Sequence, residues 1–142
     1  MTMPPLALEW LSDGREYAIA RLDPDATIPA WASDARPGIV AITRTPDELA
    51  IILPAARLPE PRPIASLGWV GLRVVGTLDF GLVGILASLT GALAGASVSV
   101  CAVSTFDTDL LFVRHADVGR AVEALSSVAD VGRLRGSGPG GG

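Results

Sequence analysis

The side chains that could perform chemistry in this 142-residue chain are few. A single cysteine, Cys101, and a single histidine, His115, exclude an internal disulfide, a cysteine-rich zinc site and a paired-histidine metal site. Catalysis by a Ser–His or Cys–His pair would have to use the one imidazole of His115. The chain contains no lysine, so a phosphate-binding P-loop is excluded as well. We expect no metal and no cofactor.

Three carboxylates, those of Asp79, Asp107 and Asp109, are candidates for acid–base catalysis. The chain offers no aromatic platform near them beyond Phe106. Aspartates at such positions commonly cap helices and close turns, so we expect Asp79 to cap a helix and Asp107 to close a hairpin loop. An enzyme that uses Asp79 and Asp107 would require both carboxylates to converge on one cleft. We rank this hypothesis below two noncatalytic ones, ligand binding and assembly.

Composition narrows the class of protein further. Apolar residues make up 49% of the chain, and 15 acidic against 11 basic residues give a net charge of -4. This balance indicates a packed core, no electrostatic surface for nucleic acid, and repulsion from anionic lipid. Residues 1–5 carry no basic side chain, and acidic residues follow early, so we expect a cytoplasmic protein without an export signal.

The uncharged stretch 80–106 is long enough to cross a bilayer, but its internal pattern predicts two shorter elements. Leucines and an isoleucine recur at helical spacing up to Leu93, and Gly95 is a plausible helix stop. Beyond it, apolar and small polar residues alternate with the period of a strand. We therefore expect a buried helix followed by a buried strand, and no membrane span.

The second half of the chain predicts an α+β fold of the ferredoxin-like βαββαβ type. Asp117 is a candidate N-cap for the second helix of this unit. The predicted order is strand 69–75, helix 81–94, strand 97–103, strand 109–113, a helix after Asp117, and a closing strand at 131–134.

The first half predicts a shorter unit of the same kind, with strands 16–22, 38–43 and 48–53 and a helical stub at 28–32. The loop 43–49 aligns with 104–110 at an offset of 61 residues, which suggests an internal repeat. We thus predict two units in tandem, the first degenerate and short. The expected boundaries are 6–60 and 64–134, followed by a flexible glycine-rich tail at 135–142.

One end of the second unit has the properties of a ligand site. A helix beginning near Gly81 presents unpaired N–H groups that favour an anion, and Gly84 would allow close approach to the backbone. The loop from Thr105 to Thr108 would face them with a carboxylate, hydroxyls and carbonyls. This pairing is complementary to a free α-amino acid. The alternative is that these residues only end a helix and turn a hairpin.

The segments 84–100 and 104–109, with Leu78-Asp79-Phe80, resemble ACT domains, the small regulatory modules that bind amino acids. They look most like tandem-ACT proteins, which include arginine-sensing Castor-type proteins and the regulatory domains of aspartokinases. The first half is similar to the degenerate first unit of that family at 29–32 and 43–49. Val83 stands where ACT helices commonly have a proline, which is a departure from the family pattern.

The resemblance implies a noncatalytic regulatory protein whose amino-acid effector lies between ACT units. A regulated enzyme would then be a separate polypeptide. A short chain with edge strands and apolar sheets often pairs with a copy of itself, so we also expect a homodimer. The alternative is a ligand-free ACT subunit that serves assembly alone. The ligand-binding positions implied by the resemblance are Asp79, Leu82, Val83, Gly84 and Ile85 on the helix side and Thr105, Phe106, Asp107 and Thr108 on the loop side.

Overall fold

The computed structural model describes residues 6–11, 16–34, 37–75 and 84–136. The chain divides into two compact units: unit 1 comprises residues 1–14 and 70–142, and unit 2 comprises residues 15–69. Strand β5 (Ile64–Val74) contributes its first part to unit 2 and its last part to unit 1. Within the described ranges, no helix is long and apolar enough to span a membrane.

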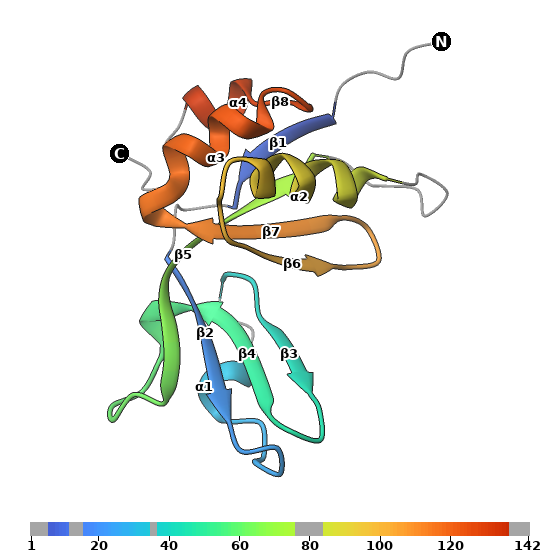
Figure 1. The fold of residues 1–142 in the computed structure, drawn as a ribbon. Helices are drawn as coiled ribbons and strands as arrows, with labels where there is room; N and C mark the ends of the chain where they lie inside the picture. Colours follow the sequence, from blue (N-terminus) through green and yellow to red (C-terminus); the bar gives the residue numbers. More distant parts are fainter. Residues whose placement is uncertain (1–5, 12–15, 35–36, 76–83, 137–142) are drawn as a thin grey trace. The chain divides into compact units, whose positions relative to one another are not determined.

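Unit 1 has the βαββαβ order that the sequence predicts, so the α+β ferredoxin-like fold is confirmed. Its sheet order is β6-β7-β5-β1-β8, and the helices α2 and α3 pack on one face of the sheet (Figure 1). After β5, the elements are α2 (Ile85–Gly95), β6 (Val100–Ser104), β7 (Asp109–Arg114), the 3-10 turn η3 (His115–Asp117), α3 (Val118–Leu125), β8 (Ala129–Asp130) and α4 (Gly132–Gly136).

Strand β1 (Leu6–Trp10), which the sequence pattern did not reveal, completes this sheet. It runs antiparallel to β5 and parallel to β8, and Leu8, opposite Val74, is fully buried. The indole N–H of Trp10 donates to the carbonyl of Leu134 at 3.1 Å. The boundaries 6–60 and 64–134 therefore differ from the structure, because the first strand belongs with the C-terminal unit. The segment contains no local signal for a partner so distant in sequence.

The closing strand predicted at 131–134 is wrong. The strand ends at Asp130, whose carboxylate accepts the N–H of Gly132 at 2.9 Å, and α4 starts there. Val131 and Leu134 are both buried, and their spacing of three residues suits one face of a helix. The apolar residues of this segment thus join the core of unit 1 from a helical turn.

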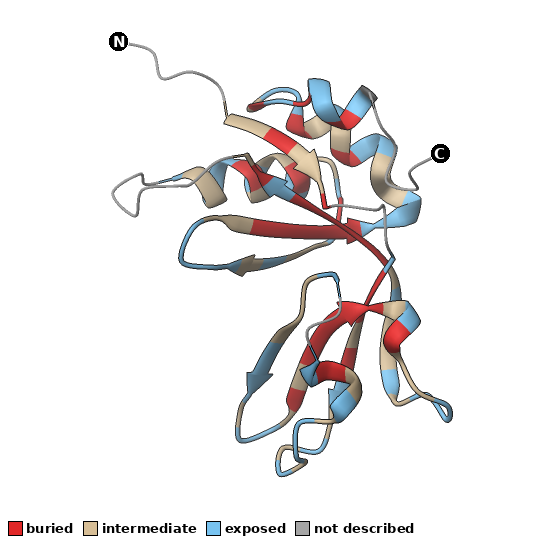
Figure 2. Ribbon diagram, turned by 180° about the vertical axis from the view of Figure 1, so that it is seen from behind, coloured by how far each residue is buried: buried red, intermediate tan, exposed pale blue. Residues whose placement is uncertain are grey.

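The core of unit 1 lies between the sheet and the helices, where β7 and the later part of β5 are mostly buried (Figure 2). Leu89 and Leu93 of α2 and Leu125 of α3 are fully buried there. On the opposite face of the sheet, Gly71 lies beneath Leu11 and Phe112. A Cβ atom at Gly71 would lie within 2.9 Å of the Phe112 ring and closer still to the Leu11 side chain.

We predict that Gly71→Ala destabilises the protein by about 1–3 kcal/mol, because the added methyl group overpacks the contact with Leu11. Chemical denaturation measures the change. Gly91→Ala is the matched control, since Gly91 lies in α2 with open space around its Cβ position. That control should stabilise by about 0.5–1 kcal/mol through helix propensity. Equal effects of the two variants would contradict the close packing at Gly71.

Unit 2 repeats the topology in shortened form, with sheet order β3-β4-β2-β5. The first helix has four residues, and a three-residue 3-10 turn stands between the last two strands, where unit 1 has α3. The elements are β2 (Tyr17–Leu22), α1 (Ala30–Ser33), β3 (Ala41–Arg44), β4 (Leu49–Pro54) and η2 (Ala55–Arg57).

The small core of unit 2 is closed by an ion pair between a buried arginine and an exposed aspartate. Ala18 and Ala20 of β2 pack with Ile51 of β4 and with the single turn of α1. The Arg57 side chain, which is 5% exposed, pairs with Asp34 at the end of α1 at 2.5 Å between Nη2 and Oδ1. The Nε and Nη1 atoms of Arg57 have no hydrogen-bond partner among the described residues.

We predict that Asp34→Ala destabilises the protein by about 1–3 kcal/mol, because it leaves the buried guanidinium without its counter-charge. Arg57→Met should be close to neutral, since an apolar side chain of similar length needs no counter-charge. Thermal and urea unfolding of both variants measure the difference. The same loss in both variants would show that the burial of charge does not govern this contact.

Candidate functional site

Three segments of unit 1 meet at one end of its sheet: the end of β5, the start of α2 and the turn between β6 and β7 (Figure 1). A hydrogen bond of 3.1 Å from the Thr108 hydroxyl to the Val74 carbonyl joins the turn to β5. Among the sequence-predicted site residues, Asp79, Leu82 and Val83 lie outside the described residues. The described residues at this end are Gly84, Ile85, Thr105, Phe106, Asp107 and Thr108.

The helix at this end begins at Ile85, later than the predicted start near Gly81. Gly84 precedes it with a φ of 84°, a left-handed conformation, and among the described residues no side chain caps the helix; Asp79, the expected cap, lies outside them. The carbonyl of Gly84 accepts the N–H of Ser88 at 2.8 Å. The first N–H groups of a helix have no partner within it, so this terminus favours an anionic group. Glycine is also required here by the backbone conformation itself.

The turn between β6 and β7 is closed by Thr105, whereas the sequence pattern assigned that role to Asp107. The Thr105 hydroxyl accepts the Thr108 N–H at 3.2 Å and donates to the Thr108 carbonyl at 3.0 Å. Asp107 is exposed, and Phe106 at the tip is 81% exposed. The Thr105 hydroxyl thus holds the shape of the turn, the Thr108 hydroxyl ties the turn to β5, and the side chains of Phe106 and Asp107 project from it.

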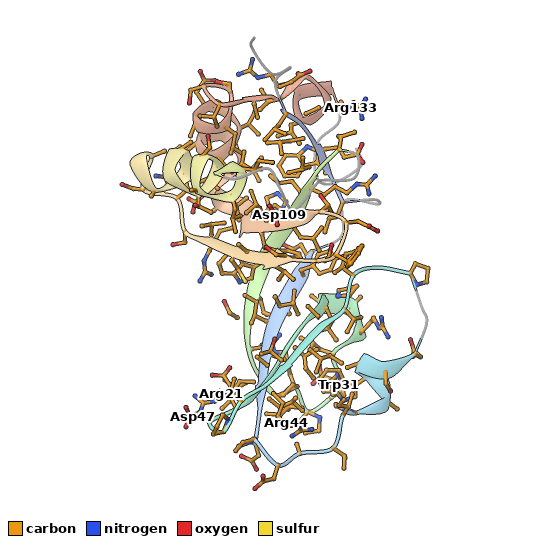
Figure 3. All side chains as sticks on the ribbon, turned by 90° about the vertical axis from the view of Figure 1, so that its right-hand side faces the viewer. Arg21, Trp31, Arg44, Asp47, Asp109 and Arg133 are labelled. Carbon is orange, nitrogen blue, oxygen red and sulfur yellow. The ribbon has the colours of Figure 1, made fainter. Side chains whose placement is uncertain are left out.

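Asp109, labelled in Figure 3, is a further candidate for the ligand site, whereas the sequence pattern named it only among three carboxylates for acid–base catalysis. It lies opposite Ser104 in the β6–β7 pair, and its Oδ1 accepts the Ser104 hydroxyl at 2.7 Å. Leu111 and Val113 of the same strand belong to the core beneath the helices, so alternation places Asp109 on that face. Only this register, together with the core, reveals which side of the sheet the carboxylate occupies.

The corresponding turn of unit 2 shows the same hydrogen bonds. The Thr45 hydroxyl accepts the N–H groups of Asp47 and Glu48, both at 3.1 Å, and the Thr45 N–H donates to the Glu48 carbonyl. Thr45 therefore matches Thr105, and Asp47 matches Asp107. The offset between the two turns is 60 residues in the structure, so the predicted offset of 61 is wrong by one position.

The two turns differ in the residue that ends the first strand. Unit 2 has Arg44, whose guanidinium donates to the carbonyls of Pro24 and of Ala26, the latter at 2.7 Å. It thereby ties the turn region to the connection between β2 and α1. Unit 1 has Ser104 at this position, with a short side chain that bonds within its own hairpin. Unit 1 thus has no basic side chain at the position where Arg44 bonds main-chain carbonyls in unit 2.

The chain's one thiol and one imidazole, those of Cys101 and His115, lie outside the turn and the start of α2. Burial raises the pKa of the Cys101 thiol, which keeps it protonated and poorly nucleophilic at neutral pH. His115 follows Arg114, at the opposite end of β7 from the turn. Among the described residues, no three of the types His, Cys, Asp and Glu are grouped to hold a metal ion.

We predict that Gly84→Ala destabilises the protein by about 1–2 kcal/mol, because an alanine in the left-handed region is strained. Gly84→Asn should cost less, since asparagine tolerates this conformation better than alanine does. Denaturant unfolding measures both. Space is open around the Cβ position, so a larger loss for asparagine than for alanine would contradict the backbone explanation.

Comparisons with known proteins agree with this fold. The ACT domain model matches residues 65–127, and a second model, of an N-terminal domain, matches residues 15–61. Among curated protein sequences, none matches the chain.

Three solved structures illustrate the likeness. The crystal structure of protein Atu0741 from Agobacterium tumefaciens is 34% identical, covering 91% of this chain and 92% of that one, with a TM-score of 0.81. The Vibrio cholerae protein VC0802, of unknown function, is 19% identical over 89% and 91%, with a TM-score of 0.69. The ligand-free regulatory subunit of aspartate kinase from Thermus thermophilus is 10% identical over 88% and 99%, with a TM-score of 0.63.

The two structures with lower identity show a shared fold only. The Agobacterium relationship extends over nearly the full length of both chains, and the ACT match covers most of unit 1 from β5 to α3. The chain therefore belongs to the same protein family as Atu0741, and its residues 65–127 match the model of the ACT domain.

Proposed function

We propose that this protein is a noncatalytic regulator that binds a free amino acid at the end of unit 1 where α2 begins. The observation that carries the proposal is the meeting of the start of α2 and an acidic, hydroxyl-rich turn at one end of the sheet. The helix N–H groups suit the carboxylate of an amino acid. The carboxylates of Asp107 and Asp109 suit its ammonium group.

The individual residues have different roles in this proposal. Gly84 and Ile85, with Asp79, Leu82 and Val83 before them, form the helix side of the site. Thr105 and Thr108 hold the turn through hydrogen bonds that they already make. Asp107 and Asp109 receive the ammonium group, and Phe106 covers the ligand side chain.

We further propose that the two units are a tandem pair of ACT type, unit 2 being the degenerate member. The repeated threonine-closed turn supports this relationship. In unit 2, Arg44 already bonds the connection before α1, so we assign the ligand to unit 1. The protein would act in the cytoplasm as a homodimer. Its ligand would bind one arrangement of the subunits more tightly than another and so regulate a partner enzyme.

A second candidate function is assembly without a ligand. Phe106 is 81% exposed at the tip of the turn, and β6 is an edge strand of the sheet. An exposed aromatic side chain beside an unpaired strand edge suits contact with another protein chain. In this case the end of unit 1 would be an interface, and its aspartates would contribute solubility and specificity.

The first test is thermal unfolding of the full chain with each of the twenty amino acids at millimolar concentration. A ligand at 100 times its dissociation constant stabilises the native state by about 2.7 kcal/mol. For a chain of this size, that corresponds to a rise in Tm of roughly 5–10 °C. A clear responder supports the proposal. A flat panel contradicts an amino-acid ligand.

The second test locates the site for the responding amino acid. Asp109→Asn should weaken binding by about tenfold to a hundredfold, because it removes a charged acceptor for the ammonium group. Glu123→Gln is the matched control: Glu123 is an exposed acid on α3 that pairs with Arg135, and its loss should leave the affinity unchanged. Isothermal titration calorimetry measures both. Unchanged affinity in Asp109→Asn would show that the ligand binds elsewhere.

Light scattering of the protein without ligand distinguishes the assembly function from the ligand-binding function. If the turn is an interface, the Phe106→Ser variant has a lower mean mass than the wild-type protein, and its Tm is largely unchanged. If the turn is a ligand site, Phe106→Ser leaves the mass unchanged and reduces the ligand-induced rise in Tm.

A further inference from the structure

We draw no further inference here: the strongest candidate, the buried guanidinium of Arg57 between η2 and the end of α1, has Nε and Nη1 without a partner among the described residues, but both atoms are sealed from solvent and nothing in the structure shows a space through which a ligand would reach them.

Discussion

The end of strand β5 is held from both sides, and the candidate site depends on this constraint. On one side, the Val75 N–H donates to the Ala7 carbonyl of β1 at 2.8 Å. On the other side, the Val74 carbonyl accepts the Thr108 hydroxyl at 3.1 Å. Leu8 of β1 lies opposite Val74 at this point, and both side chains are buried. The turn and the end of β5 are therefore positioned by hydrogen bonds backed by the core.

In unit 1, the residues that form the core are different from those of the proposed ligand site. The apolar residues of α2, α3, β5 and β7 supply the burial that stabilises the sheet. At the end of the sheet the chain leaves polar groups that the core does not use: the first N–H groups of α2 and the carboxylates of Asp107 and Asp109. Because the threonine hydroxyls are already engaged, these groups can face a ligand without distorting the turn.

Unit 2 has the same topology as unit 1, but its helical elements are shorter. Its helix α1 has one turn, and η2 replaces a second helix, so alanines on β2 bring the sheet close to the covering segments. Arg57 and Asp34 close this reduced core with charge where unit 1 uses leucines. Arg44 likewise bonds main-chain carbonyls before α1. The shortened unit thus relies more on specific polar contacts.

Local patterns in the sequence were enough to predict the α+β class, the order of the C-terminal elements and the hairpin turns, because strand alternation and helical spacing act over a few residues. The same patterns also predicted the turn 105–108 as a candidate site. They missed β1, misassigned 131–134 and misaligned the repeated turns by one residue. They named Asp109 as an acid–base candidate but did not include it in the ligand site.

Those features depend on pairing between distant segments. The strand at Leu6–Trp10 is defined by β5 and β8, and the role of Asp109 depends on the register opposite Ser104 and on the core beneath it. The sequence by itself thus determined which short elements form and which polar residues lie at their ends. Only the tertiary structure decided which strands pair, since hydrogen bonds and burial between remote segments carry no local signal.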